Sequence, residues 1–292
     1  MSEIREITIL SGKGGTGKTS VAAALASVAN RPVLCDNDVD ASNLFLLMQP
    51  KIREEHTFTS GYMLSIDPQK CIPCEICTDH CRFGAIQQIQ GKLEINPYQC
   101  EGCRLCEKIC PLEAISSVQK ENNFWHLAST RFGPILYASM GPGEENSGKL
   151  VTQLRQKAME IARKAERPYI ISDGPPGIGC PVIASLNGTG KVLLVLEPSR
   201  TALLDAARLV ELVRHFNIEL YAVINKYDLN TELCKQVEMY LNRNAIPVIE
   251  KLPFDPAMVE AMIREMTITE YKPGSTISKK IARLWKTISL MN

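Results

Sequence analysis

The sequence predicts an α/β fold, with a doubly wound and mostly parallel sheet that is interrupted by a small inserted α+β domain. Two observations carry this prediction. Apolar runs of strand length alternate with helical patterns along most of the 292 residues, as in a parallel sheet covered by helices. In addition, eight of the 11 cysteines fall within residues 71–110, so a segment of different composition divides the larger domain.

Composition and charge exclude several classes of protein. Hydrophobic residues make up 45% of the chain and charged residues 22%, which supplies a core and excludes a disordered chain. The net charge of +1 does not suit a polycation, so no nucleic-acid partner is expected. The apolar run 192–196 is far too short to span a membrane, and residues 1–10 lack a secretion signal. A cytoplasmic protein without membrane association is therefore expected.

The first predicted strand, residues 4–11, leads into a glycine-rich loop. Residues 12–19 match the pattern G-x4-G-K-T, and residues 20–29 form a helical pattern. Strand, loop and helix in this order predict a P-loop, whose backbone N–H groups and helix N-terminus surround a phosphate. Lys18 is expected to contact the β- and γ-phosphates, and Thr19 to bind Mg²⁺. The predicted nucleotide-binding residues here are Gly12, Lys13, Gly14, Gly15, Thr16, Gly17, Lys18, Thr19 and Ser20.

Two further predicted strands, residues 32–36 and 169–173, end in Asp36 and Asp173. Both carboxylates are expected at the Mg²⁺ site. Asp38 and Asp40 follow Asp36 at alternate positions, and carboxylates so close to a phosphate site are costly unless cations neutralise them. One of these two is expected to orient or activate the attacking water, with Asp40 slightly favoured. A solvated turn is the alternative.

The cysteine-rich segment is an internal repeat. Residues 66–71 match residues 95–100, and the run C-x2-C-x2-C-x3-C recurs 29 residues later. An odd number of cysteines without a secretion signal argues against disulfides. In this run, three thiolates converge on one 4Fe–4S cluster and the fourth reaches the other cluster. The predicted ligands are Cys71, Cys74, Cys77 and Cys110 for the first cluster, and Cys100, Cys103, Cys106 and Cys81 for the second. A zinc-ribbon array is the alternative.

Two resemblances follow from these motifs. Residues 65–118 resemble a bacterial two-cluster ferredoxin, except that Arg82 replaces the usual proline after the fourth cysteine of the first run. Residues 13–19 resemble the deviant Walker A motif of the MinD, ParA and nitrogenase iron protein family of ATPases, and residues 37–44 and 174–181 resemble its switch I and switch II. In that family the first lysine of the motif crosses a dimer interface, which implies a catalytic role for Lys13 beside Lys18. The family's base contacts fall on Asn225, Lys226, Pro253 and Asp255.

The whole chain resembles MinD-superfamily ATPases that carry an inserted two-cluster ferredoxin. The ATPase domain would span 1–64 and 119–292, and the insert 65–118, flanked by predicted strands at 56–60, 62–66, 124–130 and 132–137. The implied function is a dimeric ATPase, homomeric or paired with a paralogue, that uses ATP, Mg²⁺ and the two clusters to couple nucleotide state to electron transfer to a redox partner protein. An iron–sulfur or metallocofactor assembly or carrier ATPase is one alternative, although no C-x-x-C follows Cys110. A redox-sensing positioning ATPase is another.

Three cysteines lie outside the repeat. Cys35 and Cys234 fall in apolar patterns and are expected in the core. Cys180 follows Asp173 by seven residues, where the nitrogenase iron protein has a cluster ligand, and a buried structural thiol is favoured over a ligand of a bridging cluster. The amphipathic pattern at 278–290 is expected to dock on the sheet, with a MinD-like membrane helix as the alternative.

Overall fold

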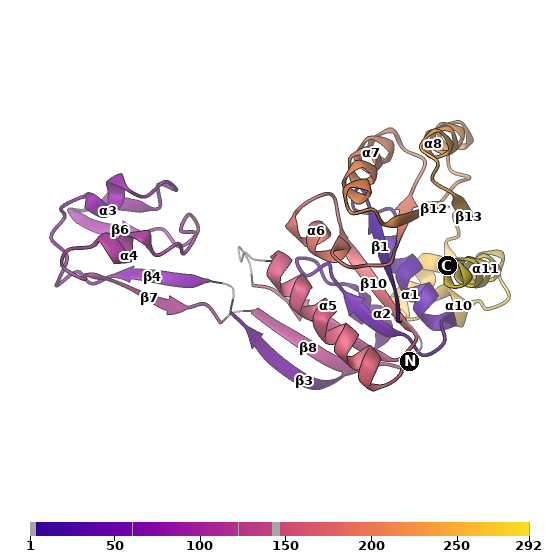
Figure 1. Cartoon of the computed structure of the whole chain (residues 1–292), viewed down its shortest axis with the longest axis horizontal. Helices are drawn as coiled ribbons and strands as arrows, with labels where there is room; N and C mark the ends of the chain where they lie inside the picture. Colours follow the sequence, from indigo (N-terminus) through magenta and orange to yellow (C-terminus); the bar gives the residue numbers. More distant parts are fainter. Residues whose placement is uncertain (1–3, 60, 122, 142–146, 292) are drawn as a thin grey trace. The chain divides into compact units, whose positions relative to one another are not determined.

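The structure is a computed structural model that describes residues 4–59, 61–121, 123–141 and 147–291 (Figure 1). The chain divides into two compact units. One unit contains the chain up to Glu55, residues Trp125–Ser139 and the chain from Ser147 onward, and the other is built mainly from His56–Phe124.

A sheet of nine strands forms the centre of the first unit, in the order β13-β12-β11-β1-β10-β2-β9-β8-β3. The strands are β1 (Arg5–Ser11), β2 (Val33–Asp36), β3 (Lys51–Phe58), β8 (Asn123–Ser129), β9 (Pro134–Ser139), β10 (Tyr169–Pro176), β11 (Lys191–Leu196), β12 (Glu219–Asn225) and β13 (Val248–Leu252). Neighbouring strands from β13 to β9 are all parallel. Their carboxyl ends therefore share one edge, where Asp173 pairs in register with Asp36.

Helices cover both faces of this sheet (Figure 1), which confirms the doubly wound α/β prediction. They are α1 (Lys18–Val28), α2 (Leu44–Met48), α5 (Ser147–Lys164), α6 (Cys180–Leu186), α7 (Arg200–His215), α8 (Thr231–Arg243), α9 (Ala257–Ile263), α10 (Ile268–Tyr271) and α11 (Thr276–Leu290). Because side chains alternate along a strand, Ile9 packs with α1 and α11, whereas Leu10 packs with α6, α7 and α8. Among the described residues, no helix is both long and apolar enough to cross a bilayer.

The C-terminal helix α11 docks on the sheet, as expected. Ile277, Ile281, Leu284 and Ile288 are buried in the same core as α1. Their spacing of three or four residues gives α11 one apolar face, and that face is already occupied by the protein itself. The alternative of a free membrane-binding helix is therefore not supported.

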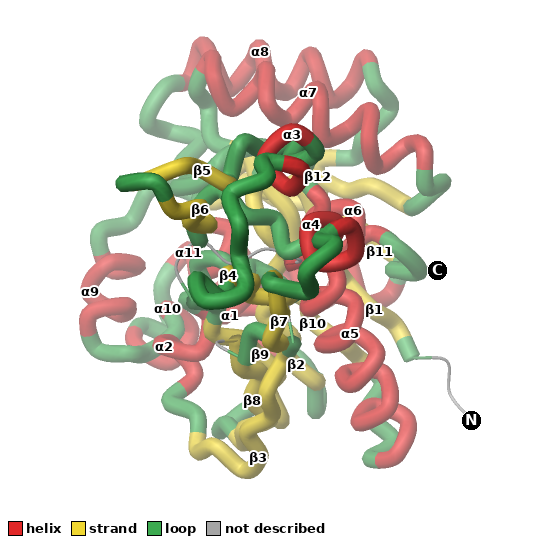
Figure 2. Tube along the Cα trace, turned by 90° about the vertical axis from the view of Figure 1, so that its left-hand side faces the viewer, coloured by secondary structure: helices red, strands yellow, loops and turns green. Residues whose placement is uncertain are grey.

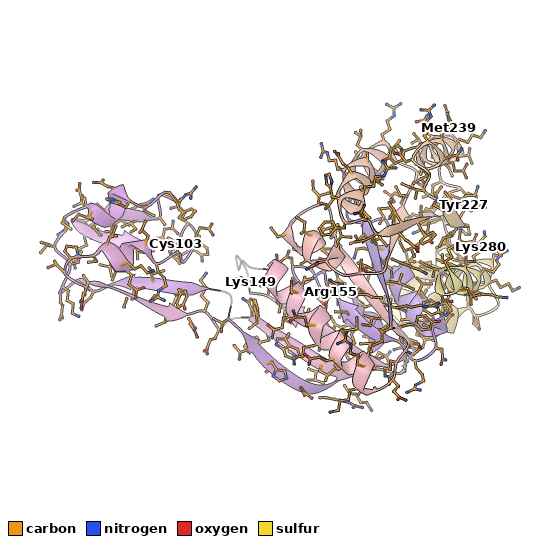
Figure 3. The ribbon with its side chains drawn as sticks, viewed as in Figure 1. Cys103, Lys149, Arg155, Tyr227, Met239 and Lys280 are labelled. Carbon is orange, nitrogen blue, oxygen red and sulfur yellow. The ribbon has the colours of Figure 1, made fainter. Side chains whose placement is uncertain are left out.

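A buried ion pair near the amino end of β1 joins several elements of the first unit. Arg155 of α5, labelled in Figure 3, donates to both carboxylate oxygens of Glu6 in β1 at 2.7 and 2.9 Å, and to the carbonyl oxygen of Ala184 in α6 at 2.8 Å. Ser172 of β10 donates to the same carboxylate. Since every polar atom of this pair has a partner, it fixes α5 and α6 side by side (Figure 2).

The second unit is small and repeats itself. Its elements are β4 (Tyr62–Ile66), α3 (Ile76–Asp79), β5 (Ile86–Ile89), β6 (Lys92–Ile95), α4 (Leu105–Ile109) and β7 (Ile115–Gln119), with β4 antiparallel to β7 and β5 antiparallel to β6. Equivalent residues of the two copies share unusual backbone angles: φ is +62° at Glu75 and +63° at Arg104, just before α3 and α4. The sequence repeat is therefore also a repeat of conformation.

The strands predicted at 124–130 and 132–137 are β8 and β9, displaced by one and two residues, and another predicted strand differs more. The strand expected at 56–60 is β3, which begins at Lys51 and ends at Phe58, and Ser60 lies outside the described residues. Seven of its eight residues are exposed, so it lacks the alternation of buried and exposed residues that reveals a strand in sequence. Such a charged strand suits the end of a sheet, where it hinders pairing with other chains.

Candidate functional site

Two glycines allow the loop between β1 and α1 to take its shape. A Cβ atom on Gly12 would lie 2.5 Å from the backbone nitrogen of Ala206, so α7 packs directly on the loop. Gly17 has φ of +89°, and a Cβ atom there would lie 2.3 Å from Nδ2 of Asn225. That amide donates to the carbonyl oxygen of Thr16 at 2.8 Å. Asn225, at the end of β12, therefore holds the loop in a conformation in which the backbone N–H groups of the loop can bind a phosphate.

Lys18 lies within a group of carboxylates at the carboxyl edge of the sheet. Its Nζ is 2.8 Å from Oδ1 of Asp173 and 3.6 Å from Oδ2 of Asp38, and its side chain is only 7% exposed. Burial lowers the pKa of Lys18, but attraction to Asp173, Asp38 and Asp36 outweighs it, and the pKa is raised overall. The amine is therefore held charged where a nucleotide's phosphates would enter.

Asp36 shapes the loop that follows β2. Its carboxylate accepts hydrogen bonds from the hydroxyl of Ser42 at 2.6 Å and from the backbone N–H groups of Asp38, Asn43 and Leu44. Burial, together with the nearby charge of Asp173, raises the pKa of Asp36 to about 7. A divalent cation beside it would favour the ionised form. Asp36 therefore holds the predicted switch I in place in addition to any contribution to a magnesium site.

A pocket of about 690 Å³ opens beside Lys18. The predicted residues that line it are Gly14, Gly15, Thr16, Gly17, Lys18, Thr19, Ser20, Asp38, Asn225, Lys226, Pro253 and Asp255. Leu46 of α2 and Met258 and Met262 of α9 add an apolar wall. Buried polar atoms at this edge, Oγ1 of Thr16 and Oδ2 of Asp173, have no hydrogen-bond partner among the described residues. Such atoms are free to bind a phosphate, a cation or its water.

The two candidate switch I carboxylates differ in position. Asp38 lines the pocket and faces Lys18, and burial raises its pKa. Asp40 is exposed and does not line the pocket. The slight preference for Asp40 therefore has no support from the geometry of this pocket, although Ala41 and Asn43, further along the same loop, also line it.

Lys13 points away from the pocket toward Glu197. Glu197 was not among the site residues predicted from the sequence. The Nζ of Lys13 is 2.8 Å from Oε1 of Glu197 and 3.3 Å from Oγ1 of Thr201. Lys226 holds the other oxygen of Glu197 at 3.2 Å and donates to the carbonyl oxygen of Gly15 at 3.0 Å. Glu197 directly follows β11, the neighbour of β1, and that position at the carboxyl edge is the signal that could have identified it.

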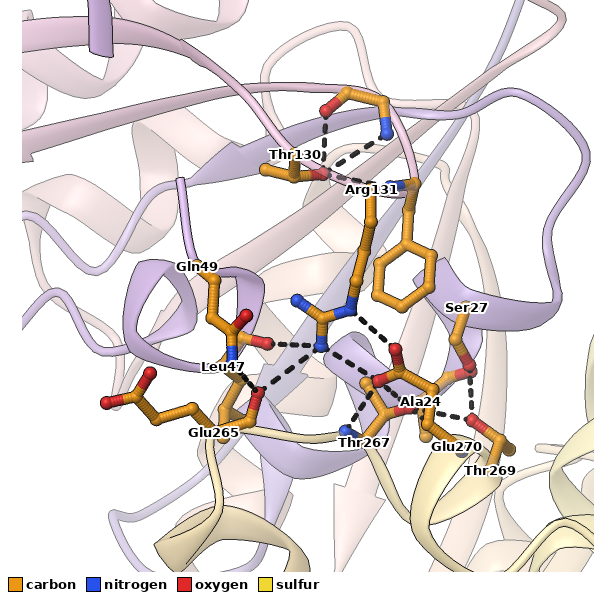
Figure 4. Close-up of polar contacts among 12 residues, drawn as sticks. Ala24, Ser27, Leu47, Gln49, Thr130, Arg131, Glu265, Thr267, Thr269 and Glu270 are labelled. Atoms are coloured by element: carbon orange, nitrogen blue, oxygen red, sulfur yellow. Dashed lines mark hydrogen bonds and ion pairs between the residues drawn. The ribbon is translucent and has the colours of Figure 1, made fainter. Parts of the chain in front are cut away.

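Arg131, in the turn between β8 and β9, ties together two walls of the pocket (Figure 4). It donates to the carbonyl oxygen of Leu47 in α2 at 2.9 Å and to that of Glu265 after α9 at 3.3 Å. It also forms a bidentate ion pair with Glu270 of α10, at 2.5 and 2.8 Å. Glu270 in turn completes the capping box of α10 with Thr267. One guanidinium thus fixes α2 relative to the turn after α9.

Replacing Arg131 by glutamine is expected to lower stability by about 2 kcal/mol, because a charged donor loses its hydrogen bonds to Glu270, to Glu265 and to the partly buried carbonyl oxygen of Leu47. Thermal unfolding followed by circular dichroism measures this as a fall in melting temperature. Arg163→Gln is the matched control, since Arg163 is exposed on α5. Equal melting temperatures for wild type and Arg131→Gln would show that this cluster does not stabilise the fold.

The eight repeated cysteines surround two cavities in the second unit, and Cys103 is labelled in Figure 3. One cavity, of about 280 Å³, is lined by Cys77, Cys81, Cys100, Cys103 and Cys106. The other is narrower, about 20 Å³, and is lined by Cys71, Cys74, Cys77 and Cys110. Cys77 borders both. Each predicted set of four cysteines therefore lies around one cavity, with the fourth cysteine coming from the other copy of the repeat.

The remaining cysteines differ from one another. Cys35 and Cys234 are buried, which confirms that they pack in the core. Cys180 is exposed at the first residue of α6, so the expectation of a buried thiol there is wrong. The reason is that Cys180 follows an exposed loop at residues 178–179 and begins α6, where Gly148 of α5 lies against it without burying it.

This loop, pocket and sheet edge define a P-loop nucleotide-binding protein of the α/β class. The family model described as the CobQ/CobB/MinD/ParA nucleotide binding domain matches residues 7–268. The chain belongs to this family and is a MinD/ParA-like P-loop ATPase.

Relatives and solved structures agree with this assignment. Uncharacterized protein MJ0578 of Methanocaldococcus jannaschii is 32% identical over 97% of this chain and 96% of its own length. The septum site-determining protein MinD of Pyrococcus horikoshii, solved with Mg-ADP, has the same fold, with a TM-score of 0.59, 17% identity, and coverage of 98% of this chain and 96% of that one. An iron-sulfur cluster carrier protein of Rickettsia typhi is 24% identical over 42% of this chain and 39% of its own length.

Proposed function

We propose that this protein is a dimeric ATPase that couples its nucleotide state to electron transfer through two 4Fe–4S clusters to a partner protein. The observation that carries the proposal is that two complete sets of four cysteines surround adjacent cavities in a chain that also holds a P-loop pocket. When bound, such clusters supply one-electron redox chemistry. Mg²⁺ and ATP would occupy the pocket beside Lys18.

The cysteine cavities suit clusters better than zinc. Within the described residues, no three Cys, His, Asp or Glu side chains are placed to hold a single metal ion. Zinc requires four ligand atoms drawn together at about 2.0–2.3 Å from one ion, whereas a cluster holds its four thiolates apart around a larger core. Burial raises the pKa of the Cys106 thiol to about 11, so it is neutral at pH 7 unless iron binds and deprotonates it.

At the nucleotide, each polar residue has a distinct role. Lys18 would neutralise the β- and γ-phosphates, while Thr19 and the oxygen of Asp173 that lacks a hydrogen-bond partner among the described residues would hold Mg²⁺ directly or through water. Asp38 lies on the phosphate side of the pocket and orients the attacking water. Asn225, Lys226, Pro253 and Asp255, which line the same pocket, would contact the base.

The connectivity of the chain supports coupling between nucleotide and clusters. The loop held by Asp36 continues through α2 and β3 into β4, the first strand of the cysteine-rich unit. The chain returns through β7, β8 and β9 to α5 and then to β10, which carries Asp173. A nucleotide that moves the loop after Asp36 or the loop after Asp173 would therefore displace a segment that is continuous in the chain with the cluster-binding unit.

We propose further that ATP joins two copies, or this chain and a paralogue, face to face through Lys13. In the isolated chain Lys13 is held by Glu197, with 28% of its side chain exposed. It must leave this carboxylate to reach a partner's phosphates. The added negative charge of ATP across the interface favours that exchange.

Replacing Lys13 by alanine is therefore expected to preserve ATP binding but to prevent ATP-dependent dimerisation and to slow hydrolysis about 1000-fold, as for other cations supplied in trans. Analytical ultracentrifugation with and without MgATP, and phosphate release, measure the two effects under anaerobic conditions. Lys157→Ala is the control, since Lys157 is an exposed lysine paired only with Glu160 among the described residues. Wild-type hydrolysis by Lys13→Ala would rule out the sandwich dimer.

An iron–sulfur carrier is the second candidate, because part of the chain is related to a protein of that name. A carrier must release its cluster to an apo-acceptor. Eight cysteines that enclose two cavities favour retention instead. Incubation of the iron-loaded chain with an excess of an apo-ferredoxin separates the two functions: rapid transfer of iron and sulfide supports the carrier, and electron transfer without loss of iron supports the redox protein.

A further inference from the structure

The two cysteine cavities differ in the residues around them. Besides cysteines, the cavity of Cys81, Cys100, Cys103 and Cys106 is lined by His80, Arg82, Glu101 and Arg104 and by apolar side chains, and it is called the arginine cavity below. The cavity of Cys71, Cys74, Cys77 and Cys110 is called the apolar cavity, because its other lining residues are Ile72, Ile76, Leu93, Pro111, Leu112, Ala114 and Ile115. The two copies of the repeat therefore build two chemically different sites.

The two arginines are placed differently. The guanidinium carbon of Arg104 lies 4.4 Å from the centre of the Tyr62 ring, and its Nε donates to Glu107 at 2.6 Å, so much of its charge is balanced. The guanidinium carbon of Arg82 lies 5.7 Å from the centre of the Phe83 ring. No carboxylate of the described residues forms an ion pair with Arg82. Its charge therefore remains available to whatever the cavity holds.

Reduction adds one negative charge to an iron–sulfur cluster. Positive side chains and N–H donors favour the reduced form, whereas an apolar lining disfavours the added charge. Two features act in the opposite direction: Glu101 in the arginine cavity, and a hydrogen bond of 3.3 Å from the backbone N–H of Ala114 to Sγ of Cys110 in the apolar cavity. The charge of Arg82, which has no ion-pair partner among the described residues, opposes that of Glu101. His80 and the Glu107-paired Arg104 add N–H groups to the lining, whereas the hydrogen bond in the apolar cavity comes from a neutral donor.

We propose that the cluster of the arginine cavity has the higher reduction potential of the two, and that Arg82 is the residue that sets the difference. This inference rests on the proposed cluster binding. With both clusters bound, an electron that a low-potential one-electron donor delivers to the apolar-cavity cluster would pass to the arginine-cavity cluster and leave the first cluster oxidised again. The shared border at Cys77 makes the path short. The residues that line the two cavities would therefore set the direction of electron transfer between the clusters.

A redox titration of the iron-loaded full chain, followed by electron paramagnetic resonance, tests the proposal. Two one-electron waves are expected. Cys74→Ser should leave only the higher wave, and Cys103→Ser only the lower. Arg82→Gln should lower the midpoint potential of the higher wave alone, by about 59 mV. This shift corresponds to about a tenfold change in the ratio of reduced to oxidised cluster. Glu101→Gln should shift the same wave in the opposite direction, and Lys92→Gln, outside both cavity linings, should shift neither.

The outcomes separate this inference from the proposed function. A chain that binds no iron and gives no cluster signal would overturn both. Two clusters with identical potentials, or an Arg82→Gln variant in which the lower wave moves instead, would overturn the redox asymmetry and leave cluster binding intact. Because Arg82→Gln changes no ligand, this comparison does not depend on the folding of the cysteine variants.

Discussion

The Lys18→Ala variant is expected to lose measurable ATP binding, with an affinity at least about 100-fold below that of wild type. The lost hydrogen bonds of a charged donor to phosphate are worth about 3 kcal/mol, and each 1.4 kcal/mol is a factor of ten. Lys18 is the cation placed among the pocket's carboxylates, 2.8 Å from Asp173 and 3.6 Å from Asp38. Without it, these carboxylates would also repel the incoming phosphates. Isothermal titration calorimetry with MgATP measures the change.

The same substitution removes the partner of buried Asp173, which by itself destabilises a fold. Thermal unfolding without nucleotide must therefore accompany the titration. The double variant Lys18→Ala/Asp173→Asn removes the unpaired charge as well, and it is expected to recover stability but not ATP binding. Lys157→Ala serves as the surface control. Wild-type affinity in a folded Lys18→Ala protein would contradict the P-loop assignment of this pocket.

The Cys74→Ser variant is expected to lose about half of the iron. Two cubane sites predict about eight irons and eight sulfides in each chain when it is prepared without oxygen, and Cys74 lines only the apolar cavity. Iron and acid-labile sulfide assays, with the visible absorption of the clusters, measure the loss. The physical reason is that a cluster held by three thiolates leaves one iron open to solvent and to oxidation.

Cys180→Ser is the matched control, because Cys180 is also an exposed thiol but lies outside both cavities. It is expected to keep the full iron content. Loss of iron from this variant on ATP-dependent dimerisation would instead indicate a cluster shared between two copies. Bound zinc without visible absorption would exclude the ferredoxin-like interpretation and support the zinc-ribbon alternative.

Much of the first unit could be predicted from the sequence because its signals are local. The buried strands β1 and β10 contain apolar runs that were predicted at 4–11 and 169–173, and the second of these runs ends in the predicted Asp173. Strand β3 was predicted only at residues 56–60, and its start at Lys51 was missed because Lys51–Phe58 is charged and exposed, so neither alternation nor an apolar run marks it. Periodicity detects burial, and an exposed end strand has little of it.

The sequence by itself determined the two motifs whose parts are adjacent along the chain. The glycine loop before Lys18 and the two cysteine runs depend on fixed spacing, because backbone N–H groups and thiolates converge only when a few residues separate them. The repeat also paired each fourth cysteine with the opposite copy, in agreement with the cysteines that share each cavity.

Only the tertiary structure decided which distant residues meet. It placed Asp38 rather than Asp40 at the pocket, Glu197 against Lys13, and Cys180 at the surface. It also gave two cysteine runs of identical spacing one polar and one apolar cavity lining, since His80 and Arg82 follow one helix while Pro111 and Leu112 follow the other. These contacts depend on how strands and helices that are far apart in sequence pack together. The spacing of residues along the chain does not reveal which of them come into contact.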